Sequence, residues 1–420
     1  MGRLLLLLPS ATYRAAAFVE AARQLGVTLS VASERPSTFE QAQPSGLLTL
    51  DFSDPERAAT QAQRFAREYP LNGVLGVDDD TVVVAAAIAE RLGLRGNTVM
   101  AALRARDKYE QRVGLERAGV RVPRFAVHPV SVAPAQLGPT IRYPAVLKPL
   151  RLAASRGVIR ANGPEEFVAA WERIRAILSG PDIVPCGEAG QRILVEDFVP
   201  GPEVAVDGLL RRGLLQVLAI FDKPDPLEGP FFEETIYVTP SRLPREVQNH
   251  VERAVQAATR ALGLAEGAVH VELRCNRAGV WLIELAARPI GGRCSSALRF
   301  ELQGKREEGR GKGKATLEEI LIRHAMGETL PAFRREAQGS GVMMIPVPAK
   351  GVLREVRGLE EARAVPLVSG VEITAHKGDR LVPWPEGARY PGFIFARGAE
   401  PEAVEAALRA AHARLDFILE

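Results

Sequence analysis

The chain has 420 residues, of which 46% are hydrophobic, and this is enough for several domains with substantial cores. Its 54 lysine and arginine residues are nearly balanced by 51 aspartate and glutamate residues, which does not favour nucleic acid as a partner. The three cysteines lack the spacing of a metal site, which favours a reducing, cytoplasmic location. Only eight of the basic residues are lysines, so an isolated lysine in an apolar segment can indicate a site that needs a compact ammonium group.

The first hundred residues alternate between the patterns of strands and helices. The apolar run at residues 4–8 is too short for a membrane span or for the core of a signal peptide, so it predicts a buried strand. Strands that alternate with helices predict a doubly wound parallel sheet with helices on both faces, here in an N-terminal α/β domain at residues 1–105. The predicted strands are residues 4–8, 27–32 and 73–77, and the predicted helices are residues 13–25, 55–68 and 81–92.

Three aspartates, Asp78, Asp79 and Asp80, stand directly before the helix predicted at residues 81–92. Acidic residues at a helix N-terminus interact favourably with the helix dipole and can accept hydrogen bonds from its free amides. We therefore interpret the three aspartates as helix caps.

Three further units follow the N-terminal domain. Residues 106–199 combine a charged helix with strands and a second helix, and residues 200–330 are rich in strands. The Gly- and Lys-rich stretch at residues 304–314 predicts a mobile surface insert in the second of these units. Residues 331–420 have the pattern of short strands with a final helix, which predicts a small α+β unit.

A strand predicted at residues 143–148 ends at Lys148, an isolated lysine in an apolar run. A loop of small residues follows at residues 152–157, and such a loop lets backbone amides approach a phosphate group. An ordinary strand end and an ordinary loop fit the same pattern, so the residues alone leave both interpretations open. Residues 193–203 then predict a strand that enters a Pro-Gly turn, whose backbone groups can face an adenine edge.

Residues 268–286 predict a β-hairpin, AVHVELRCNRAGVWLIELA, with a three-residue loop that ends at Gly279. This loop pairs Asn276 with Val280 and places Glu272 directly opposite Glu284, with Cβ atoms about 5 Å apart. Two carboxylates so close destabilise a sheet unless a cation or a shared proton lies between them.

Two interpretations of this glutamate pair remain open. A hard cation such as Mg²⁺ binds a few carboxylates together with substrate phosphates, which this face of the hairpin can offer. Alternatively, Arg274 and Arg288 lie on the same face and neutralise both glutamates in a solvated surface. The alternating apolar residues are predicted to bury the opposite face, and they are Val271, Leu273, Ile283 and Leu285.

Six short segments occur in a characteristic order along the chain. They are RDK at 106–108, YPAVLKP at 143–149, SRGV at 155–158, VEDFVPGPE at 195–203, HVELR at 270–274 and IELAARPIGG at 283–292. In this order and spacing the chain resembles the ATP-grasp superfamily, and specifically its L-amino-acid ligase branch, over essentially the whole length. The resemblance implies a pre-ATP-grasp domain, a two-lobed α+β core with its small lobe at 106–199 and its large lobe at 200–330, and a ligase-associated C-terminal domain.

The resemblance also implies roles for individual residues. Lys108 and Lys148 would hold the phosphates of ATP, under the loop that contains Ser155 and Gly157. Arg288 would contact the transferring group, as a catalytic residue together with Lys148. The adenine contacts would come from Glu196, Phe198 and Val199, the ribose contact from Glu203, and Glu272 and Glu284 would bind Mg²⁺, or Mn²⁺ in its place.

Some positions keep open interpretations. Many ATP-grasp enzymes have an asparagine where this chain has Ala286, which leaves the number of metal ions open, although this form is associated with the amino-acid ligases. Lys223 and Glu234 can contact substrate or phosphate, or be structural. His270 favours a structural role over a phosphate contact, and Cys294 favours a packing role over that of a nucleophile.

The implied activity is an ATP-dependent carboxylate–amine ligase. A carboxylate, expected to be that of an amino acid, would be converted to an acyl phosphate and joined to an amine as an amide or dipeptide, with release of ADP and phosphate. Two alternatives remain: a carboxylase-like enzyme that phosphorylates bicarbonate, and a nucleotide-binding regulatory protein without turnover. The expected partners are small-molecule substrates, without nucleic acid or membrane, and the resemblance is compatible with a homodimer.

Overall fold

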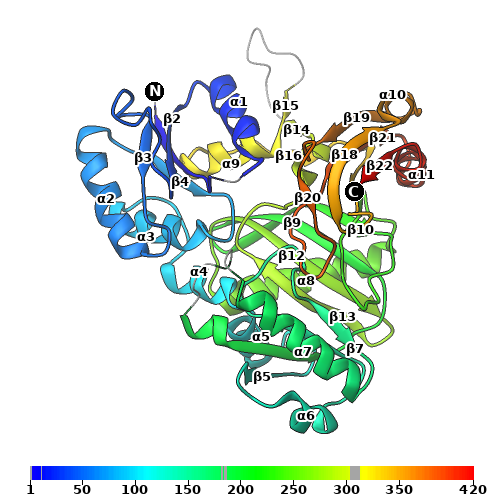
Figure 1. Ribbon diagram of the computed structural model, residues 1–420. Coiled ribbons are helices and arrows are strands. Elements are labelled where there is room, and N and C mark those ends of the chain that lie inside the picture. Colours follow the sequence, from blue (N-terminus) through cyan, green and yellow to red (C-terminus); the bar gives the residue numbers. More distant parts are fainter. Residues whose placement is uncertain (1, 11, 181–182, 184–186, 303–312) are drawn as a thin grey trace.

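The computed structural model describes residues 2–10, 12–180, 183, 187–302 and 313–420 (Figure 1). Most of the insert predicted at 304–314, and Cys186, lie outside these residues. Among the described helices, none is both long enough and apolar enough to cross a membrane.

The N-terminal domain contains a four-stranded parallel sheet with helices on both faces, as the alternating pattern predicted. Leu5 and Leu7 pack toward α2 and α3, whereas Leu4 and Leu6 pack toward α1 and α9. Strands buried on both faces read as continuous apolar runs, which explains the five leucines at residues 4–8. The strands are β1 (Arg3–Leu7), β2 (Thr28–Ser33), β3 (Leu47–Thr49) and β4 (Gly73–Gly76), and the helices are α1 (Ala15–Leu25), α2 (Pro55–Glu68), α3 (Val82–Leu92) and α9 (Leu317–Ala325).

The small lobe is an antiparallel sheet in the order β5-β8-β6-β7. Phe167, Trp171 and Ile174 on α7 are fully buried against one face of this sheet. The elements are β5 (Phe125–Pro129), α6 (Pro134–Leu137), β6 (Ala145–Pro149), β7 (Ile159–Ala161), α7 (Pro164–Leu178) and β8 (Arg192–Asp197). Two preceding helices, α4 (Val99–Arg106) and α5 (Lys108–Arg117), pack instead on α8 of the large lobe.

An eight-stranded sheet in the order β13-β12-β9-β10-β11-β17-β21-β19 forms the centre of the molecule. One face is covered by α8, through Val251, Val255 and Leu262, and the opposite face packs on the N-terminal domain. The first five strands of this order come from residues before 331 and the last three from residues after it, so the sheet runs across the predicted domain boundary. The elements before that boundary are β9 (Glu203–Arg211), β10 (Leu214–Lys223), β11 (Ile236–Thr239), α8 (Arg245–Leu262), β12 (Gly267–Asn276) and β13 (Gly279–Ala286).

The C-terminal unit packs α11 on the end of the central sheet. Its elements are β17 (Gly339–Met344), β18 (Gly351–Arg357), α10 (Leu359–Arg363), β19 (Val368–Ile373), β20 (Arg380–Leu381), β21 (Gly392–Gly398), α11 (Pro401–His412) and β22 (Asp416–Leu419). A small separate sheet contains β14 (Phe300–Leu302), β15 (Lys314–Ala315) and β16 (Phe333–Arg335). The segment that follows β20 extends from the C-terminal unit toward the small lobe (Figure 1).

The glutamate hairpin has a different register from the predicted one. Asn276 pairs with Gly279, so the loop has two residues rather than three. A β-bulge at Ile283 adds one residue to β13 and restores the predicted pairing of Glu272 with Glu284. The prediction for Ile283 was wrong, because the bulge turns it toward the pocket between the lobes and Leu282 is buried in the core instead.

Candidate active site

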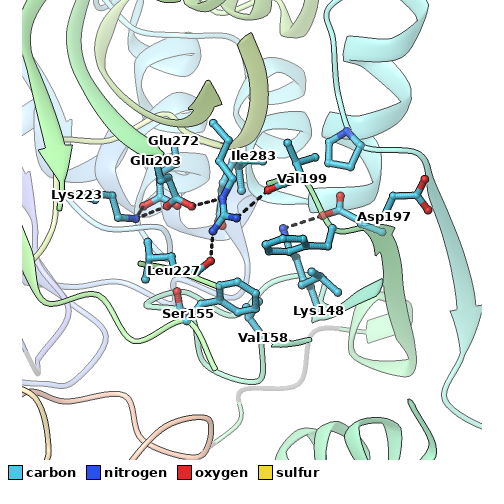
Figure 2. Close-up of a pocket in the computed structure, with 17 residues that line it drawn as sticks. Lys148, Ser155, Val158, Asp197, Val199, Glu203, Lys223, Leu227, Glu272 and Ile283 are labelled. Carbon is cyan, nitrogen blue, oxygen red and sulfur yellow. Dashed lines mark hydrogen bonds and ion pairs between the residues drawn. The ribbon is translucent and has the colours of Figure 1, made fainter. Parts of the chain in front are cut away.

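A pocket lies between the sheet of the small lobe and the central sheet (Figure 2). Eight of the predicted site residues line it: Lys148, Ser155, Glu196, Phe198, Val199, Glu203, Glu272 and Glu284. These residues come from five strands and two loops, so only the packing of the two lobes brings them together. Apolar side chains complete the wall, and they are Val146, Val158, Leu227, Phe232 and Ile283.

Lys148 is held in the pocket by a buried carboxylate. Its Nζ atom lies 2.7 Å from Glu196 Oε2, and the other oxygen of Glu196 accepts from the guanidinium of Arg112. Burial alone would raise the pKa of the Glu196 carboxyl, but the charges of Arg112 and Lys148 outweigh burial and lower it. The side chain of Glu196 therefore orients Lys148, a role that the sequence did not indicate.

The ring of Phe198 lies between two guanidinium groups. The Cζ atoms of Arg160 and Arg274 lie 4.2 Å and 5.1 Å from its centroid. Arg274 also donates to the backbone oxygen of Val199 over 2.8 Å, while the amide of Phe198 donates to Pro144 O over 2.9 Å. These contacts hold Phe198 and Val199 in place directly after β8, where contacts with adenine were predicted.

Lys223, a buried lysine that lines the pocket, lies among three carboxylates. Lys223 Nζ lies 2.5 Å from Glu203, 2.7 Å from Glu234 and 3.2 Å from Glu272. Burial would lower the pKa of Lys223, but the three carboxylates outweigh burial and raise it well above its usual value. Burial together with the charge of Glu272 raises the pKa of Glu234 to about 8. Glu203 shares its other oxygen with Arg274 at 2.8 Å, so its side chain is engaged within the protein.

Glu272 and Glu284 lie opposite each other, and each is paired with a lysine. Lys223 contacts Glu272, and Lys108 Nζ lies 2.8 Å from Glu284 Oε1. Burial would raise the pKa of Glu272, but the charge of Lys223 outweighs it and lowers the pKa well below its usual value. Lysines therefore compensate the negative charge of the two carboxylates. The alternative surface interpretation assigned this role to arginines, but Arg274 pairs with Glu203 and Arg288 pairs with Asp79.

Lys108 joins the hairpin to the small-residue loop. It is the first residue of α5, and its Nζ atom also donates to Leu152 O over 2.8 Å. Ser155 of this loop lines the pocket, whereas the amide of Gly157 donates to Pro385 O of the C-terminal unit over 2.9 Å. Gly157 thus contributes loop geometry without lining the pocket.

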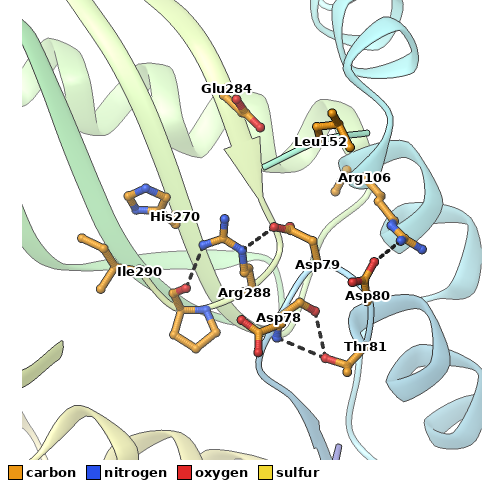
Figure 3. Close-up of polar contacts among 12 residues, drawn as sticks. Asp78, Asp79, Asp80, Thr81, Arg106, Leu152, His270, Glu284, Arg288 and Ile290 are labelled. Carbon is orange, nitrogen blue, oxygen red and sulfur yellow. Dashed lines mark hydrogen bonds and ion pairs between the residues drawn. The ribbon is translucent and has the colours of Figure 1, made fainter. Parts of the chain in front are cut away.

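The three aspartates before α3 do not cap this helix, so that interpretation was wrong. Each binds an arginine from another part of the chain, and Figure 3 shows the pairs of Asp79 with Arg288 and of Asp80 with Arg106. Asp79 Oδ2 accepts from Arg288 Nε over 2.8 Å, and Asp78 lies 3.3 Å from Arg14. Asp80 accepts from Arg106. Arg288 is thereby placed at the junction of the N-terminal domain and the central sheet, outside the pocket of Figure 2.

Two residues to which the sequence gave a structural role are buried in the structure. Burial lowers the pKa of His270, whose Nε2 atom lies 3.7 Å from Glu272, and so favours a neutral ring. Cys294 is 1% exposed, and burial raises the pKa of its thiol well above the usual value, so no thiolate is available as a nucleophile.

Sequence reasoning missed Arg112 and the role of Asp79. Arg112 stands on a charged helix in an arginine-rich chain, so nothing local distinguishes it from its neighbours. The run of three aspartates was a visible signal, but a cap explained it more simply than a long-range ion pair.

Three family models match the chain. A model of the ATP-grasp domain matches residues 141–297, and a model of the ATP-grasp N-terminal domain matches residues 19–96. The chain belongs to the ATP-grasp superfamily. Residues 343–420 match a model of the L-amino acid ligase C-terminal domain 2. This match confirms the L-amino-acid ligase branch, which the order of the motifs indicated.

Individual ATP-grasp proteins extend the comparison. The crystal structure of an L-amino acid ligase from Bacillus licheniformis superposes with a TM-score of 0.82 at 26% identity, covering 100% of this chain and 99% of that one. Alanine--anticapsin ligase of Bacillus subtilis is 30% identical over 252 residues, which are 56% of this chain and 52% of the relative. Carnosine synthase 1 of Gallus gallus is 29% identical over 294 residues, 65% of this chain and 31% of the relative. The chain thus spans about half, or less, of the length of these two curated relatives.

Proposed function

We propose that the protein is an ATP-dependent carboxylate–amine ligase that acts on amino acids. It converts the carboxylate of one substrate to an acyl phosphate, and the amine of a second substrate displaces phosphate to form an amide. The observation that carries the proposal is the arrangement of Lys148, Glu272 and Glu284 around one pocket between two lobes, with Lys108 paired to Glu284. The relatives named alanine--anticapsin ligase and L-amino acid ligase support the substrate class.

The donor set at the hairpin fits a hard divalent cation. Glu272 and Glu284 offer carboxylate oxygens from opposite positions on β12 and β13, and the low pKa of Glu272 keeps it deprotonated. Their partners are lysines, whose ammonium groups can move to phosphate oxygens. A bound Mg²⁺ would neutralise negative charge on the phosphates during transfer. With Ala286 in place of asparagine, we assign one metal position to this pair.

The residues of the chain then position and stabilise charge. Lys148, oriented by Glu196, and Lys108, at the start of α5, present ammonium groups to the phosphates. Glu196, Phe198 and Val199 line the part of the pocket assigned to adenine, and Glu203, which also lines the pocket, is assigned to the ribose. Arg288, held by Asp79, presents its guanidinium to the transferring phosphoryl group. Residues 152–157 cover the phosphates and exclude water, which would hydrolyse the acyl phosphate.

The two other functions remain testable alternatives. A carboxylase-like enzyme would release ADP in a manner that depends on bicarbonate and not on amino acids. A regulatory protein would bind ATP without releasing phosphate at all. Neither alternative is favoured by an observation of its own among the contacts of the pocket.

A phosphate-release screen tests the proposal. The protein is incubated with Mg-ATP and pairs of amino acids, and products are identified by mass spectrometry. We expect phosphate release that requires two amino acids, with a product whose mass equals their sum minus water. Phosphate release that requires bicarbonate alone, or no release with any pair, would overturn the assignment.

A further inference from the structure

The loop at residues 152–157, here the phosphate loop, is bound by the C-terminal unit. The indole Nε1 of Trp384 donates to Ala154 O over 2.7 Å, and the amide of Gly157 donates to Pro385 O over 2.9 Å. Next to them, Glu386 accepts from Arg173 on α7, with one of the two contacts at 2.8 Å. One short segment that follows β20 thus contacts both the loop and the helix of the small lobe.

The phosphate loop needs such support because of its backbone. Ala154 and Ser155 have φ angles of 54° and 55°, in the left-handed region that residues with a Cβ atom rarely adopt. A residue in this region is strained and persists only where surrounding contacts hold it. Ala154 and Gly157 make the two hydrogen bonds with the C-terminal unit. They stand on either side of Ser155, which lines the pocket.

Trp384 is itself rigidly placed. Its ring is 4% exposed and stacks on Tyr390, with centroids 4.7 Å apart. It packs in a small core of the C-terminal unit with Val347, Leu353 and Leu381. The donor is therefore fixed by the C-terminal unit, whereas the acceptor belongs to the small lobe. The pair of Arg173 and Glu386 is half-exposed, so we expect it to contribute less than the indole.

We propose that Trp384 is a positioning residue for the phosphate loop, through which the C-terminal unit holds the loop in the conformation that binds ATP. The inference rests on the proposed function for the identity of the nucleotide. The latch itself consists of the contacts of Trp384 and Pro385 with Ala154 and Gly157 and does not depend on turnover.

Hydrogen exchange of the whole protein without nucleotide tests the latch, using Trp384→Phe. Phenylalanine keeps the apolar ring and the stacking but removes the donor. We expect the amides of residues 153–157 to exchange about fivefold to tenfold faster, the factor that corresponds to one hydrogen bond. The matched control is Trp171→Phe, because the indole of Trp171 donates to Val130 O within the small lobe. Equal exchange in wild type and Trp384→Phe, or equal acceleration in both variants, would overturn the inference.

ATP binding and turnover provide a readout that a general loss of stability would not reproduce. In Trp384→Phe we expect the Kd and KM for ATP to rise about fivefold to tenfold, with kcat at saturating ATP within about twofold of wild type. A fall in kcat with unchanged ATP affinity would contradict the positioning role. If the wild-type protein binds no ATP, the proposed function fails, while the exchange experiment still decides whether the latch exists.

A second variant covers the case in which Trp384→Phe does not fold. Glu386→Lys places a positive charge against Arg173 at a half-exposed position, so the fold should tolerate it. We expect exchange of the phosphate loop to accelerate at least about twofold, on the scale of a surface ion pair. The control is Glu360→Lys, which breaks the exposed pair with Arg363 on α10 and should leave the loop unchanged. No difference between these two variants would also overturn the latch.

Discussion

Asp79 and Arg288 are 209 residues apart in the chain and form an ion pair in which Arg288 Nε donates to Asp79 Oδ2 over 2.8 Å. Burial would raise the pKa of the Asp79 carboxyl, but the charge and hydrogen bond of Arg288 outweigh burial and lower it. The pair fixes one guanidinium at the junction of the N-terminal domain and the central sheet (Figure 3). The N-terminal domain therefore shapes the site without lining the pocket of Figure 2.

Replacing Asp79 by asparagine should leave the fold intact and lower kcat by about 10- to 100-fold. A hydrogen bond to a charged group contributes roughly 1.5–3 kcal/mol. In this protein that free energy holds the guanidinium of Arg288 in its orientation, and the substitution weakens it. Steady-state kinetics with saturating ATP and substrates would measure the change. Asp80→Asn is the matched control, because Asp80 pairs with Arg106 at a more exposed position and should retain most activity. Equal losses in the two variants would contradict the positioning role of Asp79.

Lys148→Ala should lower turnover by at least about 100-fold, the scale of losing one preorganised group that stabilises charge. The variant should still fold, because Arg112 continues to compensate Glu196. The rate of phosphate release is measured in Lys148→Ala and in Lys377→Ala, which removes an exposed lysine. This comparison separates a local effect at the site from a general effect of removing a lysine. Full activity in folded Lys148→Ala would refute the assignment of Lys148 to the phosphates.

The double variant of Glu272→Gln with Glu284→Gln should be inactive and should lose its thermal stabilisation by Mg-ATP. A ligand that binds only the native state stabilises it, and the loss of the metal ligands removes this effect. Because the structure pairs both carboxylates with lysines, the variant without ligand should also unfold at a lower temperature than wild type. Thermal unfolding with and without Mg-ATP tests both points, with Glu301→Gln as the surface control. A double variant that keeps activity and its ligand response would exclude the metal site.

His324 should make the stability depend on pH below neutrality. Burial and nearby arginines lower its pKa in the fold to about 4, below the ordinary histidine value of about 6.5. Between these values the unfolded chain binds a proton that the folded chain does not, so stability falls as the pH falls. The free energy of unfolding should decrease by about 2 kcal/mol from this residue between pH 7 and pH 5. Urea unfolding of wild type and His324→Gln at both pH values isolates the contribution of His324. An equal loss of unfolding free energy in the two proteins would contradict the prediction.

The sequence alone predicted the layered N-terminal domain, the strand that carries Lys148 and the glutamate hairpin. Period and composition are local properties, so α2 was predicted with the bounds that the structure has, and the opposition of Glu272 and Glu284 was predicted too. The short edge strand β3 was missed, because three partly buried residues give no recognisable period. The hairpin register was wrong at the loop, since a bulge at Ile283 leaves no signal in the pattern.

Tertiary structure decided what each charged side chain contacts. The sequence by itself determined that Lys148 stands near a strand end and that the two hairpin glutamates share one face, because spacing fixes such positions. Only the packing of separate domains placed Arg112 on Glu196, Asp79 on Arg288 and Trp384 on the phosphate loop. Each of these pairs joins residues more than 80 positions apart, and the energy of a buried ion pair or hydrogen bond depends on distance and desolvation, which a linear sequence does not contain.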